Sequence, residues 1–435
     1  MTMWKRVGAA CAGLAFVLWV CVLAAQPLPV AKPEQVGMSS QKLAKIGAVL
    51  KKEADDGSFR GAVVMVARKG KLVYQDAVGM QTASVKMTPE AIFRIYSMTK
   101  PLVSVAAMML VEDGVIELTD PVSKYLPGFD KLQVSLPGKD ASGATTYTLV
   151  PQERQMTVQD LLRHTSGLAY GEITQNAPVK DGLEKIGVYY KNRDFDARNL
   201  TPAEQIEKMA TVPLAFQPGT SWNYSLSSDM LGRVVERASG KRLADFLEER
   251  LFKPLRMKDS GFWVPGPKLA RLAESLEKDR FAGRGFPLVD VSAQPKNDSG
   301  GAGGVSTAAD YLRFCQMLMN GGVLDGQRIL SRTTVKLMTS DHLGGAMQLP
   351  MDPGMLLLGT KGYTFGLGFM VRQGDGVAGV PGSAGEYMWA GYAGTYFWVD
   401  PKEQVTAVLM TQAASPQRAY FRKLVKQLVY QAITD

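Results

Sequence analysis

The spacing of apolar positions near the start of the chain predicts a helix followed by a β-hairpin. Residues 61–68 and 71–78 are β-branched runs separated by Lys69 and Gly70, which is typical of two adjacent antiparallel strands. An amphipathic helix is predicted before them over residues 39–56, with Ser39 as its N-cap. Its apolar residues recur at helical spacing and comprise Leu43, Ile46, Val49 and Leu50.

The pattern becomes helical after residue 97. An apolar body over residues 102–110 ends at Gly114. Because proline is tolerated only in the first turn of a helix, Pro101 requires this helix to begin a few residues earlier, with Ser97 at its amino end. The middle of the chain carries few strand signals, and further helices are predicted at 157–163, 202–210, 227–238 and 242–251.

Strand character returns toward the carboxyl end. Strands are predicted at 366–372, 394–399 and 405–410, and an amphipathic helix at 418–433. The Gly-, Met- and Leu-rich segment 343–362 is predicted to be a variable surface loop, with a mobile flap as the alternative. The two ends of the chain therefore contribute to one sheet, and the middle forms a separate, mostly helical unit.

These elements predict an α+β fold in which an antiparallel sheet is flanked by terminal helices and a mostly α-helical domain is inserted in the middle. A chain of 435 residues exceeds what one hydrophobic core usually holds, which also favours two domains. Residues 26–95 and 290–435 are assigned to the sheet domain, and residues 96–289 to the helical domain. The active site is expected between them.

The amino terminus has the pattern of an export signal. Lys5 and Arg6 precede an uncharged apolar run over residues 7–25, which ends in small residues before Gln26. Cleavage after residues 1–25 predicts a periplasmic or secreted protein; retention of this segment would instead leave a single N-terminal membrane anchor. Cleavage leaves Cys315 as the one cysteine of the mature chain, so no intrachain disulfide is expected.

Composition excludes several classes of function. The 50 Lys and Arg residues are interleaved with 41 Asp and Glu residues, so the net charge of +9 does not form the basic patch of a nucleic-acid-binding protein. Only His164 and His342 occur, and no metal site is expected from them. No cofactor is expected either, because the glycine-rich run 300–304 lacks the spacing of a nucleotide-binding loop and is predicted to be a tight turn.

Ser97 and Lys100 are the strongest candidates for catalysis. They lie three residues apart, which places both side chains on one face of a helix. Two other Ser-x-x-Lys pairs occur in polar helix surfaces, whereas Ser97 opens an apolar helix whose amino end stabilises developing negative charge. Serine needs a base to become a nucleophile. Lys100 is one candidate for this base, and Tyr224, at a loop-to-helix junction, is another because a nearby ammonium favours the phenolate form of a tyrosine.

Several ordered motifs resemble the serine β-lactamase and penicillin-binding-protein superfamily, especially class C β-lactamases and family VIII carboxylesterases. They are FRIYSMTK (93–100), LTDPV (118–122), YLP (125–127), DLLRHTSGL (160–168), FQPG (216–219), YSL (224–226) and WVDP (398–401). The resemblance covers nearly the whole mature chain. It implies that Ser97 is the acylated nucleophile, Lys100 its helix partner, and Tyr224 the general base and acid.

The third motif of that superfamily, Lys-Thr-Gly or His-Thr-Gly on a sheet-edge strand, is absent. Trp389, Ala390 and Gly391, followed by Tyr392, stand at the matching place and resemble the Trp-Gly-Gly variant of family VIII esterases. The resemblance implies that Gly391 permits close approach of this strand. It also implies that the backbone N–H groups of Ser97 and Tyr392 form the oxyanion hole.

Two departures point away from β-lactams as substrates. Trp389 offers no cationic anchor for a substrate carboxylate, and Leu226 stands where class C β-lactamases carry an asparagine. Aromatic and small residues are instead predicted to line an apolar substrate slot, namely Trp222, Trp389, Ala390, Gly391 and Tyr392. His164 is predicted to be structural.

The sequence therefore predicts an exported serine hydrolase, an esterase that acts on small-molecule carboxylic esters through an acyl-enzyme at Ser97. A β-lactamase or D,D-peptidase is the first alternative. An acyltransferase is the second, because only the acceptor of the acyl group would differ. The third is a non-catalytic protein that binds envelope components, which the missing third motif favours.

Overall fold

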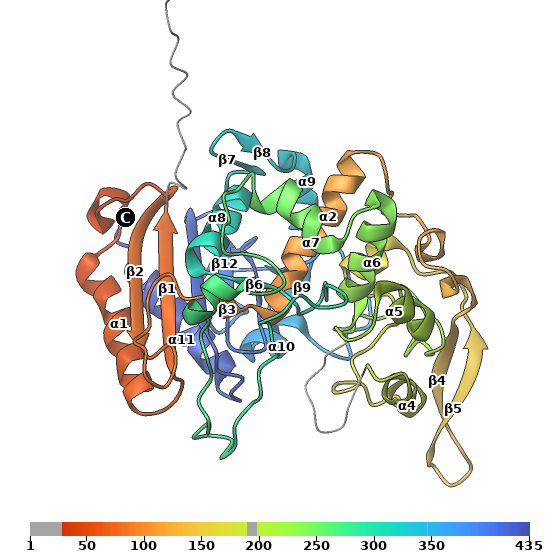
Figure 1. Ribbon diagram of the computed structural model, residues 1–435. Coiled ribbons are helices and arrows are strands. Elements are labelled where there is room, and N and C mark those ends of the chain that lie inside the picture. Colours follow the sequence, from red (N-terminus) through yellow and green to blue (C-terminus); the bar gives the residue numbers. More distant parts are fainter. Residues whose placement is uncertain (1–27, 189–197, 346) are drawn as a thin grey trace, which may run out of the picture.

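A computed structural model describes residues 28–188, 198–345 and 347–435 (Figure 1). The predicted export segment, residues 1–25, lies outside these ranges. Among the helices within them, none is both long enough and apolar enough to cross a membrane.

A seven-stranded antiparallel sheet organises one side of the molecule, in the order β2-β1-β13-β12-β11-β10-β9. The first and last parts of the chain meet within this sheet, where β1 pairs with β13 and Val64 lies opposite Leu409. The strands are β1 (Gly61–Arg68), β2 (Lys71–Gly79), β9 (Tyr363–Phe365), β10 (Met370–Arg372), β11 (Tyr387–Ala390), β12 (Tyr396–Asp400) and β13 (Val405–Thr411).

Helices cover both faces of this sheet, which explains why β1 is buried along its whole length. The terminal helices α1 (Ser40–Asp55) and α11 (Arg418–Tyr430) pack against each other beside β1 and β2 (Figure 1), and α8 (Ala308–Met319) packs against β1, β12 and β13. The predicted antiparallel sheet with flanking terminal helices is confirmed.

The middle of the chain is mostly helical. Its central helix, α2 (Thr99–Glu112), is buried over Thr99–Leu110 and packs against α6 and α7. The other α-helices of this part are α3 (Val158–Leu162), α4 (Ala177–Lys185), α5 (Pro202–Met209), α6 (Ser227–Ser239) and α7 (Leu243–Leu247).

Outside the helical part and the large sheet, the described residues form two further α-helices, α9 (Arg332–Met338) and α10 (Pro353–Leu358). They also form the short strands β3 (Phe93–Arg94), β6 (Val305–Ser306), β7 (Val323–Leu324) and β8 (Gln327–Arg328).

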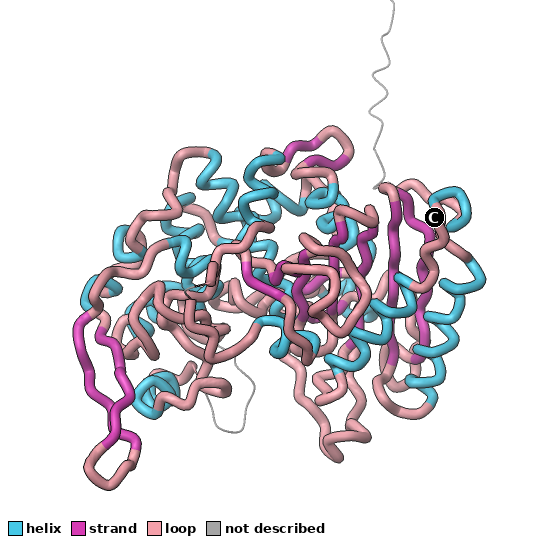
Figure 2. Tube along the Cα trace, turned by 180° about the vertical axis from the view of Figure 1, so that it is seen from behind, coloured by secondary structure: helices cyan, strands magenta, loops and turns pink. Residues whose placement is uncertain are grey.

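Several local details differ from the sequence prediction, and the hydrophobic pattern also did not identify α4, α8, α9, β9 and β11. The helical part contains a hairpin, β4 (Gln133–Lys139) and β5 (Thr145–Pro151), which projects at the end of the molecule away from the large sheet (Figure 2). Most of its residues are exposed, so the hairpin shows no alternating burial pattern that would reveal it. The predicted strand 366–372 is shorter, because the Gly366 N–H donates to the Phe369 carbonyl in a turn. The predicted surface loop 343–362 contains α10.

Candidate active site

Ser97 lies in a single 3₁₀ turn, Tyr96–Met98, directly before α2. Lys100 follows in the first turn of the helix, together with Pro101, as the position of the proline predicts. The Lys100 Nζ lies 3.3 Å from the Ser97 Oγ. The three-residue spacing therefore places the ammonium beside the hydroxyl.

The backbone of this turn is held in an uncommon conformation. Tyr96 has a φ of 43°, in the left-handed region, which costs a bulky residue about 1–3 kcal/mol. Packing around the turn maintains it: the Tyr96 hydroxyl accepts the Val289 N–H at 3.0 Å, and the Ile95 N–H donates to the Gly304 carbonyl at 2.9 Å. A Cβ on Gly304 would lie 2.7 Å from the Thr99 Oγ1, so a glycine at this position of the glycine-rich run allows it to pack closely against the turn.

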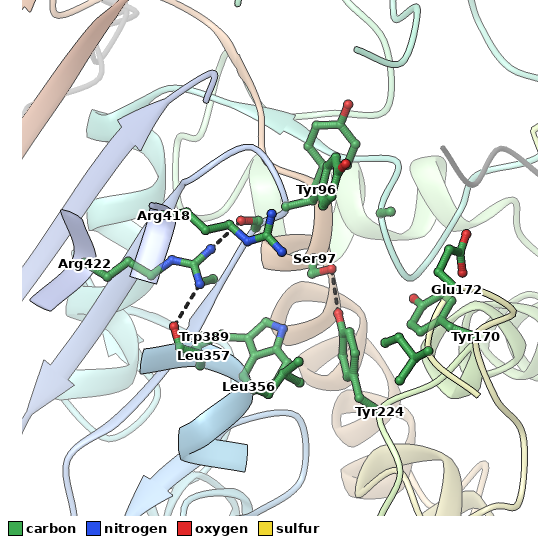
Figure 3. A pocket seen from close by; sticks show the side chains of 15 residues that line it. Tyr96, Ser97, Tyr170, Glu172, Tyr224, Leu356, Leu357, Trp389, Arg418 and Arg422 are labelled. Atoms are coloured by element: carbon green, nitrogen blue, oxygen red, sulfur yellow. Dashed lines mark hydrogen bonds between the residues drawn. The ribbon is translucent and has the colours of Figure 1, made fainter. Parts of the chain in front are cut away.

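Tyr224 approaches Ser97 from the segment before α6 (Figure 3). Its hydroxyl donates to the Ser97 Oγ at 2.6 Å, and the Lys100 Nζ lies 4.6 Å from the centre of its ring. The structure thus brings Ser97, Lys100 and Tyr224 together, although Tyr224 is far from the other two in sequence.

Lys100 has an acceptor for each of its three N–H groups. Besides the Ser97 Oγ, these are the Gly301 carbonyl at 2.7 Å and the Tyr170 hydroxyl at 3.0 Å. Burial and the neighbouring Tyr224 raise the pKa of Tyr170 well above its ordinary value, so Tyr170 remains a neutral phenol. Sequence reasoning missed Tyr170. The one signal was its position two residues after the motif that ends at Leu168.

His164 supports Tyr224 from behind. Its ring lies 5.1 Å from the Tyr224 ring, and its Nδ1 lies 3.2 Å from the Ser225 Oγ. Burial and the charge of Lys100 lower the pKa of His164 well below its ordinary value. The imidazole is therefore neutral and faces a serine other than Ser97.

Gly391 follows the end of β11 and lies against the segment that carries Ser97. A Cβ at this position would lie 2.3 Å from the Ile95 carbonyl oxygen and 2.2 Å from the Thr395 Oγ1. The close approach that the resemblance implies is thus present in the fold. It brings Tyr392 next to the nucleophile turn, where its ring centre lies 5.6 Å from that of Tyr96.

If the Tyr392 N–H is an oxyanion donor, as the resemblance implies, a Gly391→Ala substitution should lower kcat for ester hydrolysis by about tenfold to a hundredfold. The added methyl group pushes Tyr392 away from Ser97, and loss of one such donor costs about 10²–10³ in kcat. Steady-state kinetics on a chromogenic ester measure this. Gly374→Ala is the matched control, because a Cβ there meets nothing within 4 Å. Equal activity of both variants and wild type would show that the close approach has no catalytic importance.

A cavity of about 270 Å³ opens beside Ser97 (Figure 3). Its lining includes the predicted Ser97, Tyr224, Trp389, Ala390, Gly391 and Tyr392. The lining residues that sequence reasoning did not identify are Tyr96, Tyr170, Glu172, Ile173, Ala302, Leu356, Leu357, Arg418 and Arg422. Leu356 and Leu357 come from α10, so the segment predicted to be a surface loop forms an apolar wall of the site.

The prediction that Trp222 lines the slot is wrong. Its side chain is completely buried and is absent from the cavity lining. The indole packs instead against Phe365, with ring centres 5.5 Å apart, and against His164 at 6.5 Å. Full burial of so large an apolar ring stabilises the core behind Tyr224.

The site also contains cationic groups that the missing third motif did not lead us to expect. Arg418 and Arg422, one turn apart on α11, both reach the cavity (Figure 3). The Arg418 guanidinium lies 5.1 Å from the centre of the Tyr392 ring. The positive charge of the cavity therefore comes from α11 and not from the residue at position 389.

Comparison with known proteins identifies a family and several related enzymes. The family model described as Beta-lactamase matches residues 46–431. Esterase EstB from Burkholderia gladioli is 30% identical over 398 residues, 85% of this chain and 90% of that protein. Lovastatin esterase from Penicillium rubens is 30% identical over 387 residues, 83% and 91% of the two chains. Among solved structures, EstCE1, described as a hydrolase with promiscuous acyltransferase activity, has a TM-score of 0.72 at 26% identity, covering 90% of this chain and 99% of its own.

The chain belongs to the beta-lactamase family. It is an enzyme of the serine hydrolase class, related to the esterases of that family.

Proposed function

We propose that this protein is an exported carboxylesterase that acts through an acyl-enzyme at Ser97. One observation carries the proposal: the Ser97 Oγ lies within hydrogen-bond distance of both Tyr224 (2.6 Å) and Lys100 (3.3 Å), at the wall of a largely apolar cavity. A nucleophile beside its base, with room for a substrate, is the arrangement that acyl transfer requires.

Tyr224 acts as base in its phenolate form, in which the 2.6 Å hydrogen bond is reversed and the Ser97 hydroxyl donates to the Tyr224 oxygen. In the acylation step, the Ser97 Oγ attacks the carbonyl carbon of the ester as its proton passes to that oxygen. The Lys100 ammonium stabilises the negative charge shared by these two oxygens. The carbonyl oxygen becomes an oxyanion that the N–H groups of Ser97 and Tyr392 stabilise. Collapse of the tetrahedral intermediate breaks the bond to the alcohol oxygen, which takes the proton from Tyr224.

Deacylation repeats these roles with water. Tyr224 removes a proton from a water molecule, and the oxygen of that water molecule attacks the acyl carbonyl carbon. Tyr224 then returns the proton to the Ser97 Oγ as the acyl bond breaks, which releases the carboxylic acid and regenerates the enzyme. If another alcohol replaces water, the same steps accomplish acyl transfer.

The lining of the cavity supports an apolar ester as substrate. Leu356, Leu357 and Ile173 provide aliphatic surface, and Trp389 provides an aromatic wall. The names of two relatives, Esterase EstB and lovastatin esterase, also favour ester hydrolysis. The volume of about 270 Å³ suits a short acyl or a single aromatic group better than a long chain.

Active-site labelling tests the proposal. A fluorophosphonate probe should add covalently to one serine, and peptide mass spectrometry should locate the label on Ser97. Initial rates on p-nitrophenyl esters of increasing acyl length should be highest for short acyl groups. A label on another serine, or absence of turnover across the ester panel, would overturn the proposal.

β-Lactam hydrolysis is a second candidate, favoured by the guanidinium group of Arg418, which is partly exposed and lines the cavity. Such groups can bind a substrate carboxylate. A chromogenic cephalosporin in the same assay distinguishes the candidates. A kcat/KM for the cephalosporin that exceeds the value for the best ester would make β-lactams the preferred substrate.

Export is supported by Lys5, Arg6 and the apolar run over residues 7–25. Expression of the full chain in a bacterial host, followed by fractionation and N-terminal sequencing, measures it. A mature protein that begins near Gln26 in the periplasm or medium is expected. Uncleaved protein confined to the cytoplasm would contradict export.

A further inference from the structure

Arg422 connects two walls of the catalytic cavity through a single side chain. Its Nη2 donates to the Gly391 carbonyl at 2.7 Å, and its Nη1 donates to the Leu357 carbonyl at 3.0 Å (Figure 3). Gly391 follows the strand β11, and Leu357 lies in α10. One planar guanidinium therefore joins α11 to both segments, which a lysine could not do with the same geometry.

The carbonyl of Gly391 and the N–H of Tyr392 belong to the same peptide group. A hydrogen bond to the oxygen of a peptide draws electrons from its nitrogen, so the N–H of that peptide becomes a stronger donor. A charged donor has a larger effect than a neutral one. The Gly391 carbonyl also accepts the Gly394 N–H at 3.1 Å, which adds a neutral donor to the same oxygen.

We infer that Arg422 is a positioning residue that orients and polarises the Gly391–Tyr392 peptide, and so strengthens the Tyr392 N–H as a donor to the oxyanion. This inference rests on the proposed function, which assigns that N–H to the oxyanion hole. Arg422 acts through the peptide, whereas Ser97, Lys100 and Tyr224 act on the reacting atoms.

The surroundings of Arg422 preserve its influence on that peptide. The side chain is buried, and in the described parts of the chain no carboxylate forms an ion pair with its guanidinium. Burial and the neighbouring Arg418 lower the pKa of Arg422 to about 9, and the group remains charged at neutral pH. Electrostatic interactions are stronger in such a water-poor site than in solvent.

Two classes of variant separate the charge from the shape of the side chain. Arg422→Gln and Arg422→Met are neutral and should lower kcat/KM for a neutral p-nitrophenyl ester by about tenfold, because they weaken one oxyanion donor. KM should change by less than about twofold, since the substrate in its ground state carries no oxyanion. Arg422→Lys keeps the charge and should retain more activity than either neutral variant.

A boronic acid inhibitor provides a second readout. It forms a tetrahedral, negatively charged adduct with an active-site serine, so its affinity should fall in parallel with kcat/KM. All rates are expressed per site titrated with the fluorophosphonate probe, so misfolded molecules do not contribute. If one neutral variant fails to fold, kcat/KM and boronate affinity are compared between wild type and the other neutral variant. If both fail, the result rests on Arg422→Lys, which should show a loss of at least threefold in kcat and boronate affinity together.

Arg372→Gln is the matched control. Arg372 is equally buried and donates to the Gly374, Val380 and Asp375 carbonyls; it also pairs with Glu386 at 3.3 Å, and it does not line the cavity. Its variant should lower the melting temperature without changing kcat per titrated site. If Arg422 has only a structural role, its variants should also show a lower melting temperature and an unchanged kcat per titrated site. Unchanged kcat and boronate affinity in folded Arg422 variants would therefore overturn the inference. Ester turnover that survives in Ser97→Ala would instead overturn the proposed function.

Discussion

A Ser97→Ala variant is expected to hydrolyse a short p-nitrophenyl ester with a kcat at least about 10⁴-fold below that of wild type. The substitution removes the oxygen that forms the acyl-enzyme and leaves Tyr224, Lys100 and the cavity in place. Only the weaker effects of substrate binding and oxyanion stabilisation then remain. Initial rates on purified protein measure the loss, and the fluorophosphonate probe should no longer label the variant.

Ser104→Ala is a close control for this experiment. Ser104 is buried on the same helix, α2, but does not line the cavity. Its variant should retain the kcat of wild type within a few fold. Residual turnover by Ser97→Ala above about a hundredth of the wild-type rate would show that another residue, or a contaminating esterase, performs the reaction.

A Tyr224→Phe variant should lower kcat by about 10²–10⁴-fold, the usual contribution of a general acid and base. The phenyl ring preserves the contacts with His164 and Trp389, whose ring centres lie 5.1 and 5.3 Å from that of Tyr224. The hydroxyl that lies 2.6 Å from the Ser97 Oγ is lost. Stopped-flow measurement of the p-nitrophenol burst should show that acylation itself becomes slow.

Tyr170→Phe tests whether the position of the hydroxyl matters. The Tyr170 ring is tilted by 50° against the Tyr224 ring, with ring centres 5.3 Å apart, but the Tyr170 hydroxyl contacts Lys100. Its variant should lose less activity than Tyr224→Phe, because Lys100 keeps its contacts with Gly301 and Ser97. A larger loss in Tyr170→Phe would reverse the two assignments and make Tyr170 the base.

Local patterns in the sequence were sufficient for much of the fold. The hairpin β1–β2, the helices α1 and α11, and the position of Pro101 all follow from short-range spacing, because neighbouring residues decide helix starts and tight turns. Ser97 and Lys100 were found for the same reason, since three residues on a helix bring two side chains together. Tyr224 was proposed as a base from its place at a loop-to-helix junction, and the resemblance of its motif to a known superfamily supported that role.

Contacts between distant segments were not predictable in this way. Leu357 and Arg422 enter the site because α10 and α11 pack together, and neither carries a catalytic motif. Trp222 was placed in the cavity because aromatic residues were expected to line an apolar slot, yet its ring faces Phe365 in the core. Proximity along the chain does not determine the direction of a side chain, which depends on the segments that pack around it.

The sequence by itself determined the hairpin β1–β2, the helices α1, α2 and α11, the α+β class and the proximity of Ser97 to Lys100, because these depend on periodicity and on the spacing of residues within one turn. Tertiary structure alone decided the shape and charge of the cavity. Its walls come from seven separate parts of the chain, and only their packing sets the distances between them. These parts lie around Ser97, Tyr170, Tyr224, Ala302, Leu357, Trp389 and Arg422. Those distances determine which donors strengthen the oxyanion hole and which substrate fits beside Ser97.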